Sequence, residues 1–191
     1  MDELYHSLKI ICEKRKSLRN FANKSVSLED IEKIKKVSET APYTSGRKNW
    51  EIMIVNDSAI IQKMADIVKN KSNELKQQLK EDFSEEYESY ANYFVIFENA
   101  PVLFIPLFRL GMGLPYLLKN PDDSIIRWER DSYVKSIAGV ALLVVLAAES
   151  LGLGSCYMTG PLFAEQDIKK FLNIQIDKYI GAIIPVGYAK E

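Results

Sequence analysis

Two arginines and a serine alternate in a short basic segment near the start of the chain. Arg15, Ser17 and Arg19 are each separated by one residue, so in an extended segment their side chains point the same way. Guanidinium groups offer forked donors that match phosphate oxygens, and a hydroxyl adds another donor. The segment predicts an anion site, although the same pattern taken alone is more often a solvated basic turn.

Two further segments could contribute to a site. Residues 41–50 (APYTSGRKNW) are polar and precede an apolar stretch; such loops commonly lie at binding sites, although most only turn the chain. Gly152 and Gly154 end a long apolar stretch. A dinucleotide-binding fingerprint lies between a strand and a helix, whereas these glycines follow a predicted helix and precede a predicted strand. They indicate a helix termination instead.

The composition excludes several kinds of site. The chain has 25 Lys and Arg against 26 Asp and Glu, so its charge gives no reason to expect nucleic acid or an anionic membrane as partner. With one histidine, His6, and two cysteines, no metal site with zinc spacing is expected. Cys156 lies in an apolar stretch without a recognisable His or Asn partner, which indicates a core residue. The first residues lack the apolar stretch of a signal peptide, so we expect a cytoplasmic protein.

Hydrophobic periodicity predicts one α+β domain over residues 1–191. Helices are expected at Asp2–Lys14, from an N-cap at Ser27 (with Asp30 as capping-box partner) to Ala41–Pro42, from a cap at Ser58 onward, at Ser132–Leu151 and at Glu165–Leu172. Strands are expected at Trp50–Asn56, Pro101–Phe108, Gly152–Thr159 and Tyr179–Val186.

Three segments have a particular character. The helix at 132–151 is apolar almost all round, which indicates burial in the core or in a subunit interface. Residues 111–128 have no clear period, and we expect a loop or lid there. The charged stretch beyond Asn70 ends in aromatic residues at helical spacing: Phe83, Tyr87 and Tyr90.

In their order and separations, these segments resemble the nitroreductase family. That family opens with a helix followed by R-R-S-x-R-x-F, which Arg15, Ser17, Arg19 and Phe21 match. Its A-P-S-x-x-N-x-Q-P-W is matched at Ala41, Pro42 and Trp50, its later A-P at Ala100 and Pro101, its L-A-A-E-x-x-G-L-G at residues 146–154, and its closing G-Y at Gly187 and Tyr188. The resemblance covers nearly the whole chain.

The resemblance implies a three-layer α/β/α fold with a central, mostly antiparallel sheet flanked by helices and a long buried central helix. It also implies a homodimer with FMN at the subunit interface. Arg15 and Ser17, with Lys16 between them, would bind the FMN phosphate. Arg19 would lie beside the N1 and C2-oxygen edge of the ring, where a cation favours the reduced flavin anion.

The other implied contacts come from later in the chain. The backbone N–H of Thr159 would point at flavin N5, which makes Thr159 and Arg19 the implied catalytic residues. The ring would be lined by Tyr157, Met158 and Gly160. Pro42, Tyr43 and Thr44, with Gly46, would reach across from the other subunit. Lys190 is the one basic residue near the end of this sequence that could complete the phosphate site.

The implied activity is transfer of a hydride from NAD(P)H through flavin N5 to a nitroaromatic, quinone or similar small acceptor. Such chemistry needs no histidine, cysteine or carboxylate pair, because the cofactor carries it. Tyr43 stands where the family has serine, Gly46 and Lys48 replace its Asn and Gln, and Asn49 replaces its Pro.

These departures leave open a reductive relative of the dehalogenating or flavin-degrading kind. They also leave open a flavin-binding dimer without turnover. A helical interaction module without a cofactor would account for the helix at 132–151, but it would leave the alternation of Arg15, Ser17 and Arg19 unexplained.

Overall fold

A computed structural model describes residues 2–44, 48–80 and 83–190. In this part of the chain, the centre is a five-stranded sheet in the order β1-β2-β5-β3, with β4 also paired to β2. All strand pairs are antiparallel. The strands are β1 (Trp50–Val55), β2 (Val102–Arg109), β3 (Gly154–Ser155), β4 (Lys178–Ile180) and β5 (Ile184–Gly187).

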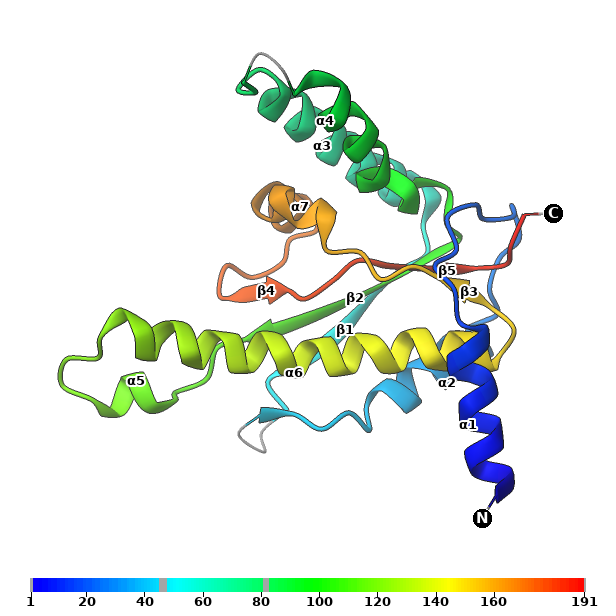
Figure 1. The fold of residues 1–191 in the computed structure, drawn as a ribbon, viewed down its shortest axis with the longest axis horizontal. Coiled ribbons are helices and arrows are strands. Elements are labelled where there is room, and N and C mark those ends of the chain that lie inside the picture. The colour runs from blue at the N-terminus through cyan, green and yellow to red at the C-terminus, as the bar shows by residue number, and fades with distance from the viewer. Residues whose placement is uncertain (1, 45–47, 81–82, 191) are drawn as a thin grey trace.

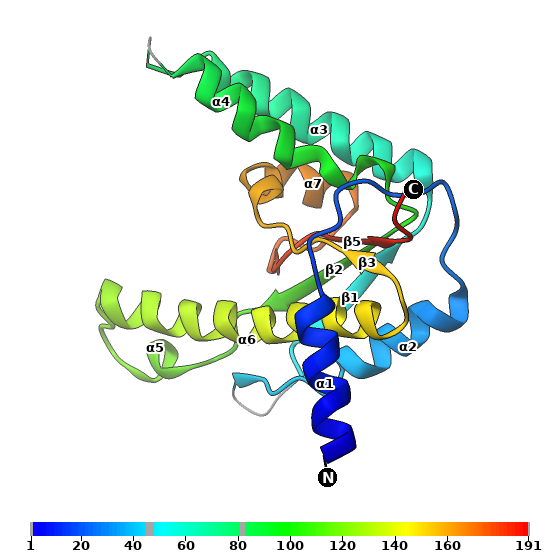
Figure 2. The ribbon, with the colours of Figure 1, turned by 45° about the vertical axis from the view of Figure 1, so that its right-hand side comes forward.

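Helices cover both faces of this sheet (Figures 1 and 2). One face carries α2 (Leu28–Ser38) and the long α6 (Asp123–Ser150), and the other carries α3 (Ser58–Lys76) and α7 (Glu165–Phe171). The arrangement is the α+β fold with helical outer layers that we predicted. The remaining helices are α1 (Asp2–Lys14), α4 (Ser84–Ala91), α5 (Leu114–Leu117) and the 3-10 helices η2 (Asn92–Asn99) and η3 (Gly160–Ala164).

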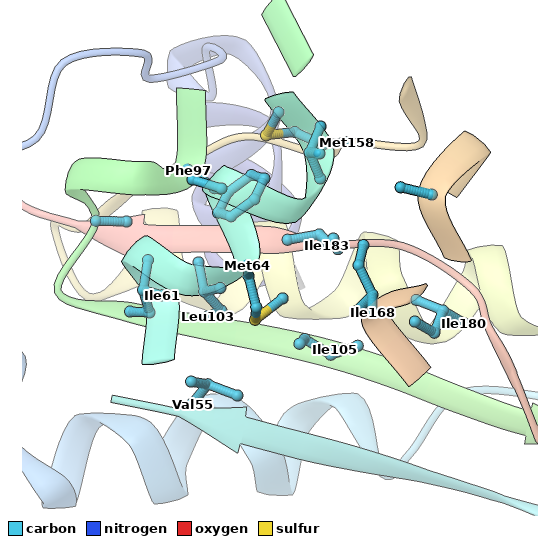
Figure 3. Close-up of a cluster of buried hydrophobic side chains, with 14 of the residues drawn as sticks. Val55, Ile61, Met64, Phe97, Leu103, Ile105, Met158, Ile168, Ile180 and Ile183 are labelled. Atoms are coloured by element: carbon cyan, nitrogen blue, oxygen red, sulfur yellow. The ribbon is translucent and has the colours of Figure 1, made fainter. Parts of the chain in front are cut away.

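The period-two pattern of β2 divides the core between the two faces. The core cluster under α3 and α7 contains Leu103, Ile105 and Leu107 of β2. Figure 3 shows Ile105 in this cluster with Met64 of α3 and Ile168 of α7. Val102 and Phe104 belong to the cluster under α2 and α6. Because β2 is buried on both sides, its sequence is apolar throughout rather than alternating.

Pro106 explains why one predicted strand, Tyr179–Val186, is observed as two. The Pro106 carbonyl accepts a hydrogen bond from Gly181 N (2.8 Å), so Pro106 faces the segment between β4 and β5. Because proline has no N–H, β2 lacks a backbone donor at this point of that edge. There the chain leaves β4 after Ile180 and resumes pairing only at Ile184. A proline in a central strand therefore marks the break between its partners.

The predicted helix boundaries were confirmed in part. Ser27 caps α2, accepting from Asp30 N at 3.0 Å, as the capping box predicted. The cap of α3 is Asp57 rather than Ser58, because the Asp57 carboxylate accepts from Ala59 N (2.8 Å). Ser58 is instead the first residue of the helix.

The central helix begins earlier than we predicted. The expected loop at 111–128 is interrupted by α5 (Leu114–Leu117) and is wrong over its second half, since Asp122 accepts from Ser124 N (2.8 Å) and α6 starts at Asp123. At 28 residues α6 is long and apolar enough to cross a membrane by length and composition, although the core helix of a folded domain meets the same test. The predicted strand at 152–159 is also shorter than expected and is limited to Gly154–Ser155.

Candidate functional site

The basic segment after α1 lies extended against β3. Leu18 N donates to Ser155 O (2.9 Å), and Ser17 forms a parallel bridge with the same residue. Leu18 turns toward the core and packs against Gly154 so closely that a Cβ there would lie 2.4 Å from Leu18 Cδ2. Since side chains alternate in an extended chain, Ser17 and Arg19 face the opposite side, as predicted.

The exposed side of this segment forms one wall of a hollow with a volume of about 220 Å³. The structure brings together six of the residues that we predicted for the site: Ser17, Arg19, Tyr157, Met158, Thr159 and Gly160. The rest of the lining is mostly apolar and comes from α4, η2 and the segment next to β3: Tyr90, Tyr93, Phe94, Ile96, Cys156 and Pro161.

The floor of the hollow offers free backbone donors. Cys156 N donates to Pro185 O (3.2 Å) and Met158 N donates to Ile183 O (3.1 Å), so these alternate N–H groups are used on the β5 side. The N–H groups of Tyr157 and Thr159 point the other way in an extended chain. In the described residues, neither of these two groups bonds to another backbone group. The Thr159 N–H is therefore a candidate donor to a molecule bound in the hollow.

The basic segment affects the pKa of the Cys156 thiol. Burial raises the pKa of this thiol, while the Ser17 hydroxyl and the positive charges of Arg19 and Arg15 act in the opposite direction. Cys156 is buried, as expected for a core residue, but it also lies in the wall of the hollow. Burial also raises the pKa of the Tyr157 phenol.

Aromatic rings form the outer wall. Tyr90 meets Phe94 edge to face at 4.8 Å between centroids, and Phe94 meets Phe163 of η3 in the same way at 4.8 Å. The Arg19 guanidinium lies over the ring of Tyr93, 5.4 Å from its centroid. The sequence showed the helical spacing that includes Tyr90, but nothing in it linked α4 or η2 to the basic segment. Sequence reasoning therefore missed this wall.

The remaining predicted site residues lie elsewhere in the single chain. Tyr43 packs beside Trp50 and Tyr133, with ring centroids 6.0 and 6.3 Å away. Thr44 N donates to Ser136 Oγ of α6 at 3.2 Å. Neither residue lines the hollow, and Pro42 does not line it either. Gly46 lies outside the described residues.

Three basic residues that we predicted for the site do not line the hollow. Arg15 and Lys16 lie beside its Ser17 wall. Lys190 N donates to Asn20 O (3.1 Å), and Lys190 lines a separate hollow of about 530 Å³ that begins at Asn20. The end of the chain thus runs beside the basic segment, where Phe21 also pairs with Ala189.

The donor set fits FMN. A flat ring with acceptor atoms at its edges needs flat walls, which the aromatic lining residues supply. It also needs N–H donors, and the backbone N–H groups of Tyr157 and Thr159 bond to no other backbone group in the described residues. An anionic phosphate needs cations and hydroxyls, which Ser17 and the flanking arginines supply. In the described part of the chain, no cluster of three or more His, Cys, Asp or Glu residues could hold a metal ion.

Comparisons with known proteins agree with this chemistry. A model of the nitroreductase family matches residues 12–188. A relative from Archaeoglobus fulgidus, a putative NADH dehydrogenase/NAD(P)H nitroreductase, is 22% identical over 184 residues, which cover 93% of this chain and 82% of the relative.

Two solved structures share the fold. A BluB-like flavoprotein from Clostridium difficile 630 superposes with a TM-score of 0.84 at 24% identity, covering 96% of this chain and 90% of that one. An iodotyrosine deiodinase bound to FMN and 3-iodo-L-tyrosine superposes with a TM-score of 0.71 at 22% identity, covering 96% of this chain and 90% of that one.

Proposed function

The chain belongs to the nitroreductase family of FMN-dependent oxidoreductases, and we propose that it passes a hydride from NAD(P)H to a small organic acceptor such as a nitroaromatic or a quinone. The observation that carries this proposal is that three residues line one hollow with aromatic side chains in its wall: Arg19, Ser17 and Thr159, whose backbone N–H has no backbone partner in the described residues. The name of the Archaeoglobus fulgidus relative supports NAD(P)H as the donor.

Each residue has a distinct task in this proposal. When bound, FMN supplies a site, N5, that accepts a hydride and gives it up again. Thr159 would donate its backbone N–H to that atom. Arg19 would hold a positive charge beside the N1 and C2-oxygen edge, which favours the reduced anion. Ser17 and Arg15 hold the phosphate, with Lys16 between them and Lys190 as a further cation from the end of the chain.

The walls of the hollow offer flat surfaces to a flat molecule. Tyr90, Tyr93 and Phe94 offer aromatic surface on the outer side. Among the described lining residues, Arg19 is the one charged side chain. A donor and an acceptor that occupy the hollow in turn are therefore selected by shape and by this single cation.

We also propose that the protein works as a homodimer. Leu4, Tyr5 and Leu8 of α1 are 80%, 70% and 55% exposed, and Leu142 near the middle of α6 is 52% exposed. A second copy would cover this apolar surface. It would also bring the 42–44 segment to the hollow, which that segment does not reach within its own chain.

A reductive relative with another substrate is the second candidate. Tyr43, Lys48 and Asn49 replace residues that face the flavin or the acceptor in the nitroreductase pattern, and the fold is shared with an iodotyrosine deiodinase and a BluB-like flavoprotein. Dehalogenation would then replace nitro or quinone reduction, while the roles of Ser17, Arg19 and Thr159 would stay the same.

The test begins with the absorption spectrum of the purified protein. We expect a yellow protein that releases about one FMN per chain on denaturation and that oxidises NADH or NADPH with a quinone or nitroaromatic acceptor. Arg19→Ala should lower the reduction potential of the bound flavin and slow its reduction, because the cation beside the anionic edge is lost. Arg130→Ala, which removes a half-exposed arginine of α6 outside the hollow, is the matched control.

Three results would contradict the proposal in different ways. A protein that neither contains FMN nor binds added FMN would refute the cofactor site. Bound FMN that no nicotinamide donor reduces would indicate a binding protein without turnover. An unchanged potential in Arg19→Ala would refute the role of Arg19 alone.

A further inference from the structure

We propose that Tyr93 is a positioning residue that orders the Arg19 side chain beneath the flavin edge. This inference rests on the proposed function, and it assigns a task to a residue that lies 74 positions from Arg19 in the sequence. It begins from the contact between the guanidinium of Arg19 and the face of the Tyr93 ring, 5.4 Å from the centroid.

The backbone around Arg19 is fixed, but its side chain is not. Leu18 N bonds to Ser155 O (2.9 Å) on one side, and Ala22 N bonds to Tyr188 O (2.9 Å) on the other. The Arg19 side chain itself is exposed, and in the described residues its guanidinium forms no ion pair and no hydrogen bond. A long side chain of this kind loses much rotamer freedom when it is ordered. A ligand that must order it on binding therefore binds with lower affinity.

Tyr93 is held by a firmly packed helix. Its neighbours Phe94 and Phe97 in η2 are buried. The end of η2 is tied to α3 by two contacts of Glu98, an ion pair with Lys69 (2.5 Å) and a hydrogen bond from Gln62 Nε2 to its carbonyl (2.6 Å). The backbone that carries the Tyr93 ring is therefore held in place, with the ring against Arg19.

A ring positions a cation in a way that a carboxylate could not. A carboxylate would neutralise the charge of Arg19 and occupy its N–H donors. A π face attracts the cation through the ring quadrupole and leaves those donors free. Arg19 thus keeps both its charge and its donors for the flavin edge, already placed at the wall of the hollow.

The test compares variants of Tyr93 by their FMN dissociation constant, measured from quenching of flavin fluorescence, and by the reduction potential of the bound flavin. Tyr93→Leu should weaken FMN binding by about two- to fivefold, as expected for an exposed cation–π contact, and lower the potential. Tyr93→Phe keeps the ring and should match the wild type. Asn92→Leu, which places a leucine on the same helix outside the hollow, is the control.

A double-mutant cycle separates positioning from a merely structural role. If Tyr93 acts through Arg19, Tyr93→Leu should have no further effect on FMN binding in an Arg19→Ala background. Full effects in both backgrounds, wild-type behaviour of Tyr93→Leu, or a loss in Tyr93→Phe as large as in Tyr93→Leu would overturn the inference. If Tyr93→Leu does not fold, as judged by circular dichroism, Tyr93→Met replaces it. A wild-type protein that binds no FMN would refute the proposed function itself, whereas these outcomes refute only the role of Tyr93.

Discussion

Replacing Gly154 by alanine should lower stability and weaken flavin binding together. A Cβ at this position would lie 2.8 Å from Leu18 Cβ and 2.4 Å from Leu18 Cδ2, whereas ordinary contacts begin at 3.4 Å. The Cδ2 atom can rotate away, but the Leu18 Cβ moves only with the backbone. That backbone is bonded to Ser155 O and carries Ser17 and Arg19 on either side of Leu18.

The expected magnitude follows from overpacking. Inserting a methyl group into a closely packed contact costs about 1–3 kcal/mol in the free energy of unfolding, because neighbours must shift. The same shift moves Ser17 and Arg19 outward, so the FMN dissociation constant should rise as well. Urea unfolding measures the first effect and fluorescence titration with FMN the second.

Two other glycines serve as controls. Gly139 of α6 has nothing within 4 Å of its ideal Cβ, so Gly139→Ala should be neutral or stabilise the chain by up to about 1 kcal/mol. Gly152 has a φ of +73° with no close neighbour, so Gly152→Ala should cost about 1–2 kcal/mol in stability without weakening FMN binding. If Gly154→Ala matched Gly139→Ala in both measurements, the close approach of Leu18 would not position the basic segment.

Two further residues that do not line the hollow, Tyr43 and Leu142, carry testable predictions. Tyr43→Phe removes a buried hydroxyl that has no hydrogen-bond partner in the described residues, and it should stabilise the protein by about 1 kcal/mol in urea unfolding; a loss of stability would show that the hydroxyl is satisfied. Burial, and then Tyr133, raises the pKa of the Tyr43 phenol, so stability is complete below the usual phenol pKa of about 10 and falls as the pH rises past it, a fall that Tyr43→Phe should reduce. Leu142→Glu places a charge on the exposed apolar surface of α6 and should shift the mass measured by light scattering from dimer to monomer, with weaker FMN binding. An unchanged mass would place the interface elsewhere.

The sequence predicted elements where one local interaction decides the structure. The Ser27 and Asp30 pair marks the start of α2, and the confirmed cap shows a hydroxyl reaching a backbone donor three residues on. The predicted start of a helix was wrong where two neighbouring residues could each act as the N-cap. Asp57 and Ser58 are both good caps, and the side chain that captures the free N–H groups is known only from the structure.

Two strand predictions were confirmed, at Trp50–Val55 and Val102–Arg109, and the other two were too long for a different reason. Apolar runs at 152–159 and 179–186 suit strands, but pairing depends on what the neighbouring strand offers. Pro106 offers no donor opposite Gly181. Beyond Ser155, the chain continues with a single hydrogen bond from Cys156 N to Pro185 O and an isolated bridge between Met158 and Ile183, rather than as a longer strand. Such limits lie in the partner strand, so neither run could reveal them.

The site likewise has one part that the local sequence predicts and another that depends on tertiary contacts. The alternation of Ser17 and Arg19 is a property of any extended segment, so it could be predicted without a fold. The aromatic wall depends on how η2 packs against α3 and η3, through contacts such as Phe94 with Phe163. No spacing in the sequence reports such a contact.

The preference among acceptors can change without loss of the cofactor, because different parts of the site are assigned to the two. The residues assigned to FMN lie on segments fixed by backbone hydrogen bonds, with Leu18 bonded to Ser155 and Met158 to Ile183. The outer wall is formed by side chains such as Tyr90 and Tyr93, which are 61% and 52% exposed and can be replaced without disturbing those bonds. Substitution of Tyr90 should therefore alter the preference among acceptors more than the affinity for FMN. Tyr93 differs from Tyr90 because it also supports Arg19, so a change there would affect both.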